Sequence, residues 1–384
     1  MIDRVRIQNF KSIVDMTMDL GRVNVIIGAN GCGKTNILEA ITFASAASQS
    51  KLENEFLGTR LRNVPSPFMF SAFDDIELQD EISITIKEGL ERKYSVKSKD
   101  GKWVNPSLII SEKIINEYLK DNSADSLLLA IKHIIQNNFN KNAVSNADLN
   151  EPQEVLDSLT YLDANSSCLQ NFLIYAPEET KLRTFSDDSY ILPFGRRGEG
   201  LFQHLKQLTE KKDTDTIQAI NEGLFMLDWF DGFNIPKDLL ANEYKLYIGD
   251  RYLNDSLHFF DQRSTNEGFL YLLFYLTLFN SKKTPPFFAI DNIETAFNPK
   301  LCTKLTEYLI STAKKNRKQV ILTTHSPYVL DGLDLSDDEV RLFVARRDID
   351  GHTLIERIPY HKNRRMPLSD LWMNGLIGGL PDNF

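Results

Sequence analysis

The sequence has no apolar stretch long enough to cross a bilayer as a helix. Its longest run, GFLYLLFYLTLF (268–279), is well short of the ~20 residues that a membrane span needs, and it predicts a buried helix instead. The N-terminus, MIDRVRIQNF, lacks the apolar core of a signal peptide. We therefore expect a cytoplasmic protein with no membrane partner.

Cysteine is also scarce, and negatively charged residues outnumber positively charged ones. The three cysteines, Cys32, Cys168 and Cys302, form no CxxC pair, so neither a zinc site nor a disulfide framework is indicated. Lys and Arg number 44 against 53 Asp and Glu, which gives a net charge of −9. This balance argues against a protein coated in nucleic-acid-binding surface, while leaving room for a local basic patch.

What the chain does have is a glycine-rich stretch, VNVIIGANGCGKTNILEAI (23–41). Its apolar start predicts a short buried strand, and Ile37, Leu38 and Ile41 fall at helical spacing. The residues between match GxxxxGK[ST], the phosphate loop, in its strand–helix context. Glycines let successive N–H groups curl around the β- and γ-phosphates, and the positive end of the helix faces the same oxygens. The stretch predicts a bound nucleotide.

The candidate nucleotide-binding residues lie in this loop and in the first turn of the helix. Lys34 would bridge the β- and γ-phosphates, and the Thr35 hydroxyl would ligate Mg²⁺. ATP and Mg²⁺ are therefore the expected cofactors. The candidates here are Gly28, Asn30, Gly31, Cys32, Gly33, Lys34, Thr35 and Asn36.

Residue patterns divide the chain into three predicted parts. In residues 1–105, period-two alternation at 4–10 and 14–20 and hairpin signals at 82–103 predict an antiparallel sheet beside the nucleotide strand. Residues 106–169 carry helical spacing and predict a helical insertion. Residues 170–384 return to mixed α/β character. There, strands at 286–292 and 318–326 flank a helix in a βαβ crossover, and a last hairpin crosses Asp350-Gly351.

Three further segments carry candidate chemistry. FFAIDNIETAFNP places Asp291 at a strand end, where a carboxylate can hold Mg²⁺. VILTTHSP presents His325 after a strand expected to lie beside the first, so that the imidazole could reach a γ-phosphate. STNEGFLYLLFYL is a polar glycine turn that enters an apolar helix. Alone, each also fits an ordinary structural role, such as a capped core helix, and their order is what makes them informative.

Together these motifs resemble the ABC-type ATPase heads of the RecF/SMC kind. They resemble more closely the bacterial AAA-family ATPases related to the OLD protein and to the ATPase subunit of PARIS-type anti-phage systems. The resemblance implies an α/β fold: an ABC-ATPase-like P-loop head, with a mixed sheet and an antiparallel β subdomain, plus the helical insertion, which lies outside it. The segments that carry it are IDRVRIQNFKSI, the phosphate loop, LPFGRRGEGLFQHL, TNEGFLYLL, AIDNIETAFNP, TTHSPYVLDGL and LSDLWMNGLIGGLP.

The resemblance also implies roles for single residues. Asp291 would belong to the Walker B motif and ligate Mg²⁺, and His325 would be the switch histidine. Asn266 and Gly268 would lie in the signature turn, which in such heads contacts ATP bound to the other protomer. Nucleotide would then join two heads. The family usually has serine where Asn266 stands, and the amide can still donate a hydrogen bond. We find no convincing glutamine loop.

A second departure concerns hydrolysis. Such heads usually carry Asp-Glu at Walker B, where the glutamate polarises the attacking water. Here Asn292 takes that place, and an amide cannot accept the proton. Glu294 is the nearest carboxylate, and whether it substitutes is open at this point. We predict an ATPase whose hydrolysis is slow.

Three functions remain to be compared. The first is an ATP-operated sensor or scaffold, a homodimer or larger homo-oligomer that controls a separate effector such as a nuclease or toxin. It is favoured because the chain stops at Phe384 without the TOPRIM nuclease that often follows in OLD-like proteins. The second is a RecF-like DNA-repair ATPase that clamps DNA. KKNRK (314–318), ARR (345–347) and HKNRR (361–365) are its candidate phosphate contacts, and each also fits an ordinary solvated surface.

GRRGEG (195–200) is a less certain segment. Its arginines could serve an anion or a neighbouring protomer, or they could form a plain turn. The third function, a transporter motor, is disfavoured by the weak signature and by the helical insertion.

Overall fold

The computed structural model describes residues 1–62, 64–99, 101–104, 167–183, 193–236, 245–254, 259–261, 263–363 and 366–380. The chain divides into two compact units. Unit 1 comprises Met1–Gly21, Gly28–Phe172 and Phe343–Arg357, and unit 2 comprises Arg22–Ile27, Leu173–Leu342 and Ile358–Phe384. Nearly all of the predicted helical insertion (106–169) lies outside the described residues, so the three predicted parts stay a prediction.

Unit 1 contains a five-stranded antiparallel sheet with the order β2-β1-β4-β5-β6. The predicted alternation is confirmed, because Val5 and Ile7 are buried while Arg4 and Arg6 are exposed. The predicted hairpin near residue 100 is also confirmed, with Lys99 paired to Lys102. The strands are β1 (Arg4–Phe10), β2 (Ile13–Asp19), β4 (Glu81–Glu88), β5 (Leu90–Lys99) and β6 (Lys102–Val104).

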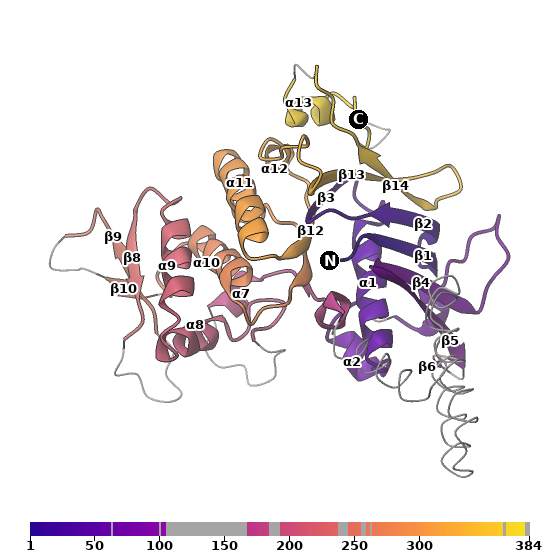
Figure 1. Ribbon diagram of the computed structural model, residues 1–384, viewed down its shortest axis with the longest axis horizontal. Coiled ribbons are helices and arrows are strands. Elements are labelled where there is room, and N and C mark those ends of the chain that lie inside the picture. The colour runs from indigo at the N-terminus through magenta and orange to yellow at the C-terminus, as the bar shows by residue number, and fades with distance from the viewer. Residues whose placement is uncertain are drawn as a thin grey trace, which may run out of the picture. The chain divides into compact units, whose positions relative to one another are not determined.

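One face of this sheet packs on α1 (Lys34–Ser48), the helix that follows the phosphate loop (Figure 1). Aromatic rings fill the space between them: Phe43 of α1 lies 5.8 Å from Phe10 and 5.2 Å from Trp103 between ring centroids. Burial of such rings stabilises the position of α1, and therefore of the loop at its start. Unit 1 also contains α2 (Asn54–Gly58) and the 3₁₀ turns η1 (Ser66–Met69) and η2 (Cys168–Asn171).

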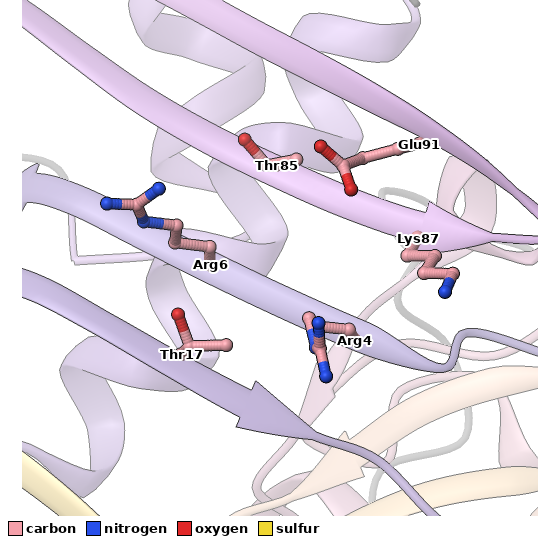
Figure 2. Close-up of a pocket in the computed structure, with 6 residues that line it drawn as sticks. All are labelled: Arg4, Arg6, Thr17, Thr85, Lys87 and Glu91. Atoms are coloured by element: carbon pink, nitrogen blue, oxygen red, sulfur yellow. The ribbon is translucent and has the colours of Figure 1, made fainter. Parts of the chain in front are cut away.

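The other face of the sheet is polar. Figure 2 shows the side chains that surround a hollow of about 220 Å³ on it. Arg4 pairs with Asp19, and Arg6 pairs with Asp15 at 2.6 Å, across neighbouring strands. The residues lining the hollow are Arg4, Arg6, Thr17, Thr85, Lys87 and Glu91.

The second sheet has the order β14-β13-β3-β12-β11-β7. In unit 2, β3, β12, β11 and β7 are all parallel, with Val25, Leu322 and Ile290 at one level. Every residue of β3, β11 and β12 is buried, as expected for strands covered on both faces. The strands are β3 (Val23–Ile27), β7 (Ile174–Tyr175), β11 (Phe287–Ile290), β12 (Gln319–Thr323), β13 (Val340–Arg347) and β14 (Thr353–Ile358).

The predicted βαβ crossover is confirmed, since α11 (Pro299–Lys315) joins the parallel strands β11 and β12. The hairpin across Asp350-Gly351 is also present, with β13 beside β14 and Asp348 N donating to His352 O at 3.0 Å. β13 begins in unit 2 and ends in unit 1. The chain thus passes from one unit to the other within a strand.

In unit 2, α10 (Glu267–Asn280) packs against α7 (Glu179–Leu182), α9 (Thr214–Leu224) and α11, and it is buried from Phe269 to its end. This confirms the buried helix predicted from the long apolar run. Sequence analysis did not predict the small antiparallel sheet beside α9 (Figure 1). Its strands are β8 (Phe230–Asn234), β9 (Tyr247–Asp250) and β10 (Phe260–Asp261). The other helices are α8 (Leu201–Glu210), α12 (Pro327–Leu330) and α13 (Leu368–Met373).

Within the described residues, no helix is both long and apolar enough to cross a membrane.

Candidate nucleotide-binding site

The phosphate loop begins at the residue after β3 and belongs to unit 1. Gly28 has φ 149°, and a Cβ there would lie 2.2 Å from the carbonyl oxygen of Ala345. Gly33 has φ 104°, and a Cβ there would lie 2.1 Å from Oγ1 of Thr353. Both backbone conformation and close packing therefore require glycine at these two positions.

Lys34 starts α1 and is 6% exposed. Its Nζ donates to the carbonyl oxygens of Gly28 at 2.8 Å and Ala29 at 3.1 Å, so the ammonium lies against the curve of the loop. Gly33, the N-cap of α1, supplies no side-chain cap, and the first turn holds no acidic residue. Such a helix start favours an anion, because its N–H groups and the positive end of the helix dipole are directed at it. The arrangement fits a nucleotide phosphate.

The other candidates in the loop differ in their surroundings. Asn30 and Gly31 are exposed, Thr35 is half-buried, and Cys32 is buried. Asn36 contacts protein groups on both sides of its amide: Nδ2 donates to Ser12 Oγ at 2.7 Å, and Oδ1 accepts from Arg62 at 3.4 Å.

Sequence analysis missed the residues whose side chains hydrogen-bond to backbone carbonyl oxygens of the phosphate loop. The hydroxyl of Thr353 donates to the carbonyl oxygen of Cys32 at 2.9 Å and lies 2.7 Å from the Ser12 hydroxyl. Arg347 Nε donates to the carbonyl oxygen of Gly31 at 3.0 Å. No local pattern could have indicated these contacts, since Ser12 and Thr353 are 341 positions apart.

In unit 2, the carboxylate of Asp291 lies at the end of β11. Its Oδ1 accepts a hydrogen bond from the hydroxyl of Thr323, the last residue of β12, at 2.5 Å. The same hydroxyl oxygen accepts from Asn292 N at 3.0 Å. Because β11 and β12 are parallel neighbours, their carboxyl ends meet at one edge of the sheet. Thr323 holds Asp291 at that edge.

Asn292 is exposed and adopts a left-handed backbone with φ 56°. Asparagine is among the non-glycine residues that tolerate this conformation best. The backbone that follows forms a tight turn in which Thr295 N donates to Asn292 O at 3.2 Å. The residue at the expected position of the general base is thus an amide held in a turn.

Glu294 points at the segment that carries His325. One carboxylate oxygen accepts from the Thr324 hydroxyl at 2.7 Å, and the other accepts from His325 N at 2.9 Å. His325 itself is exposed. Asp291, Asn292, Glu294 and His325 therefore gather around the end of β12, as their order after parallel strands predicted.

Asn266 is the N-cap of α10, and its Oδ1 accepts from Phe269 N at 2.8 Å. A Cβ on Gly268 would lie 3.4 Å from the carbonyl oxygen of Ala296, in the loop that follows Asp291. Arg183 supports this turn, because its guanidinium donates to the carbonyl oxygen of Thr265 at 3.0 Å. Sequence analysis missed Arg183.

The GRRGEG segment forms a turn beside the residues that follow β7. The carbonyl oxygens of Arg196 and Arg197 accept from Ala176 N at 2.9 Å and from Glu178 N at 3.0 Å. Arg197 Nε also donates to Glu199 at 2.9 Å. These contacts support the structural explanation of the segment.

Two protein-family models match the chain. One, described as an AAA ATPase domain, matches residues 1–194. The other, described as an AAA domain, putative AbiEii toxin, Type IV TA system, matches residues 119–331. No curated protein matches the chain.

The fold is similar to solved SMC heads. An SMC head bound to the C-winged helix domain of ScpA matches with a TM-score of 0.55 and 15% identity, over 94% of this chain and 99% of the other. The SMC head domain from Thermotoga maritima matches with a TM-score of 0.49 and 12% identity, over 94% and 99% of the two chains. The first match confirms the predicted ABC-ATPase-like P-loop fold. Since each family model spans more than half of the 384 residues and both describe AAA domains, the chain belongs to the AAA ATPase family.

Proposed function

We propose that this AAA ATPase binds ATP tightly, hydrolyses it slowly, and works as a nucleotide-dependent sensor or scaffold. In the proposal, ATP assembles copies of the chain in the cytoplasm, and the assembly controls a separate effector, a nuclease or toxin, in anti-phage defence. The observation that carries the proposal is the combination of an intact phosphate loop with Asn292 at the place of the general base.

The proposal that the chain binds ATP depends on the phosphate loop. Lys34 would neutralise the β- and γ-phosphates, and Thr35 with Asp291 would hold Mg²⁺. Gly28 and Gly33 both have positive φ, which lets the loop curl so that successive backbone N–H groups can face a phosphate. The bound Mg²⁺ would polarise the γ-phosphate. The residues of the chain would bind and orient the nucleotide.

The proposal that hydrolysis is slow depends on Asn292 and Glu294. An amide cannot take a proton from water, and a missing general base typically costs about 10²–10⁴-fold in rate. Both oxygens of Glu294 accept hydrogen bonds, from Thr324 and from the backbone of His325. These bonds favour a positioning role for Glu294, which would tie the switch histidine to the Walker B loop.

The proposals of a separate effector and of a role in anti-phage defence depend on similarity to other proteins. The motifs resemble ATPase subunits of two-component anti-phage systems, and one matching family model carries the description of a putative toxin in a Type IV TA system. The similar SMC head is bound to a domain of another protein, ScpA. A head of this fold can therefore serve as a docking platform, which supports a partner for this chain.

The first test is Lys34→Ala, measured by calorimetric titration with ATP and Mg²⁺. We expect no detectable binding, because the phosphates lose their main cation. Lys300→Ala, at an exposed position on α11, is the control and should bind as the wild type does. Thermal unfolding without nucleotide checks that both variants fold. Undiminished affinity in Lys34→Ala would contradict the phosphate-loop assignment.

One observation favours a second function, a DNA-clamping ATPase. Arg4, Arg6 and Lys87 line the polar hollow on the antiparallel sheet (Figure 2). Phosphates would have to compete with Asp19 and Asp15, the carboxylates that pair with the two arginines. The predicted basic stretches are weaker candidates for phosphate contacts, because Lys318 and Arg347 already donate hydrogen bonds to backbone carbonyl oxygens.

Two measurements separate the candidates. A clamp predicts duplex DNA binding by the isolated protein that falls steeply between low and physiological salt. A scaffold predicts tight binding to the product of a neighbouring gene and no such DNA binding. Salt-dependent DNA binding without a protein partner would contradict the scaffold.

A further inference from the structure

Two buried hydroxyl groups join the phosphate loop to distant parts of unit 1. Ser12 lies in the turn between β1 and β2 and is 5% exposed, and Thr353 begins β14 and is 1% exposed. Their hydroxyl oxygens are 2.7 Å apart, and Thr353 N donates to the carbonyl oxygen of Ser12 at 2.7 Å. Side chain and backbone thus lock these two segments together.

The direction of the hydrogen bonds follows from counting hydrogens. The one hydroxyl hydrogen of Thr353 goes to the carbonyl oxygen of Cys32, at 2.9 Å. Ser12 must therefore donate to Thr353, and the Ser12 oxygen accepts from Nδ2 of Asn36 at 2.7 Å. The result is a one-way chain from Asn36 through Ser12 and Thr353 to Cys32. Bonds in such a chain polarise and strengthen one another.

This chain determines which way one peptide group of the loop faces. The peptide between Cys32 and Gly33 is planar and trans, so its C=O and N–H point in opposite directions. With the carbonyl held on Thr353, the N–H of Gly33 is directed to the other side of the loop. Thr353 also fills the space next to Gly33, where a Cβ would lie 2.1 Å from its hydroxyl oxygen. Backbone N–H groups of the loop are the donors that bind phosphates.

We propose that Ser12 and Thr353 are positioning residues for nucleotide binding. They hold the phosphate loop in its binding conformation before the nucleotide arrives, which reduces the ordering cost of binding. The inference rests on the proposed function, in that the loop is taken to bind ATP. The effect extends to ADP as well, because ADP carries a β-phosphate.

The test is Thr353→Val, which keeps the side-chain shape and removes the hydroxyl. We expect the dissociation constants for ATP and ADP to rise about ten-fold, the factor that one lost buried hydrogen bond produces. Thr353→Ser restores a hydroxyl and should stay close to the wild type. Thr306→Val is the matched control, because Thr306 is also 1% exposed and donates to the carbonyl oxygen of Cys302 at 2.9 Å. Thermal unfolding without nucleotide shows whether each variant folds.

A double-mutant cycle with Ser12→Ala tests the chain itself. Both substitutions break the same series of bonds, so the pair should weaken binding by less than the product of the single effects. Additive effects, wild-type affinity in Thr353→Val, or equal weakening in Thr306→Val would each overturn the proposal. If Thr353→Val does not fold, Ser12→Ala takes its place, and unchanged affinity there overturns it. A wild type that binds neither ATP nor ADP would contradict both the proposed function and the positioning role, whereas a wild type that binds ATP together with unchanged affinity in Thr353→Val would contradict the positioning role alone.

Discussion

At the scale of residues, two consecutive threonines decide how the acidic groups after β11 are held. Thr323 is the last residue of β12, and Thr324 follows it directly in the chain. One hydroxyl donates to Asp291 and the other to Glu294. The two carboxylates are thereby separated into a candidate Mg²⁺ ligand and a group that holds the His325 segment.

Asn292→Glu tests whether hydrolysis is slow for want of a base. We expect the turnover rate to rise roughly 10²-fold, because a carboxylate regains the place from which water is polarised. The left-handed backbone at this position (φ 56°) should cost the variant ~1 kcal/mol of unfolding free energy. Asn292→Gln has similar length and strain but no basic oxygen, and it is the control. Equal rates in the two variants, measured as phosphate release, would show that the missing base is not the limit.

Glu294→Gln tests the other carboxylate. If Glu294 positions the His325 segment, the slow rate should change only a few-fold, because an amide oxygen still accepts one of the two bonds. Turnover of many ATP per second by the wild type, lost completely in Glu294→Gln, would identify Glu294 as the base. The slow-switch function would then be wrong.

At the scale of elements, α8 buries a histidine that packing keeps neutral. His204 is 1% exposed, its Nε2 lies 2.9 Å from Ser281 Oγ, and its ring centroid lies 5.5 Å from that of Phe194. Burial lowers its pKa from 6.5 to about 4, with a smaller contribution from Lys283. Charging the ring inside the core is unfavourable, so α8 carries a built-in sensitivity to acid.

The sign of this effect follows from the two states. Between pH 6.5 and about 4 the unfolded chain binds a proton at His204 that the folded chain does not. Unfolding free energy should therefore fall as the pH drops through this window, by up to ~3 kcal/mol from this group. Urea titrations at pH 7.5 and pH 4.5 measure it. The drop should be smaller in His204→Gln than in the wild type or in the control His361→Gln, at an exposed position. Equal decreases in unfolding free energy in all three proteins would contradict the assignment of this acid sensitivity to His204.

At the scale of the whole molecule, the proposed function depends on association between copies. The start of α10 is the candidate contact, since Asn266 caps it with its amide oxygen and keeps the amide N–H groups as donors. Arg183 stabilises the preceding turn. A helix start presented in this way suits the phosphate of a nucleotide bound to a second copy.

Gly268→Arg should leave nucleotide binding by a single copy intact and prevent ATP-dependent association. Gly268→Ala is the matched control. Its added Cβ would lie 3.4 Å from Ala296 O, an ordinary contact, so the turn should keep its shape. Sedimentation velocity with and without ATP gives the mass of each variant. An ATP-dependent rise in mass that persists in Gly268→Arg would show that the signature turn has been misplaced.

Local patterns in the sequence were enough for much of the fold. Alternation predicted β1 and β2, the apolar run predicted α10, and strand–helix–strand order predicted the crossover through α11. The small sheet of β8, β9 and β10 was missed. Two of its strands span only Tyr247–Asp250 and Phe260–Asp261, which is too short for a period to show.

Neighbouring residues in the chain were enough to predict the phosphate loop, the strand ends that carry Asp291 and His325, and the amide at Asn292. Each depends on residues adjacent in the chain, whose geometry is set by backbone dihedrals and by hydrophobic period. The contacts that hold these groups in place became visible in the folded structure. The Ser12–Thr353 contact and the ion pairs of buried Glu39 with Lys11 (2.7 Å) and Arg62 (2.8 Å) join distant positions. Such pairs form because folding brings separate strands and helices together, and no local pattern records which will meet.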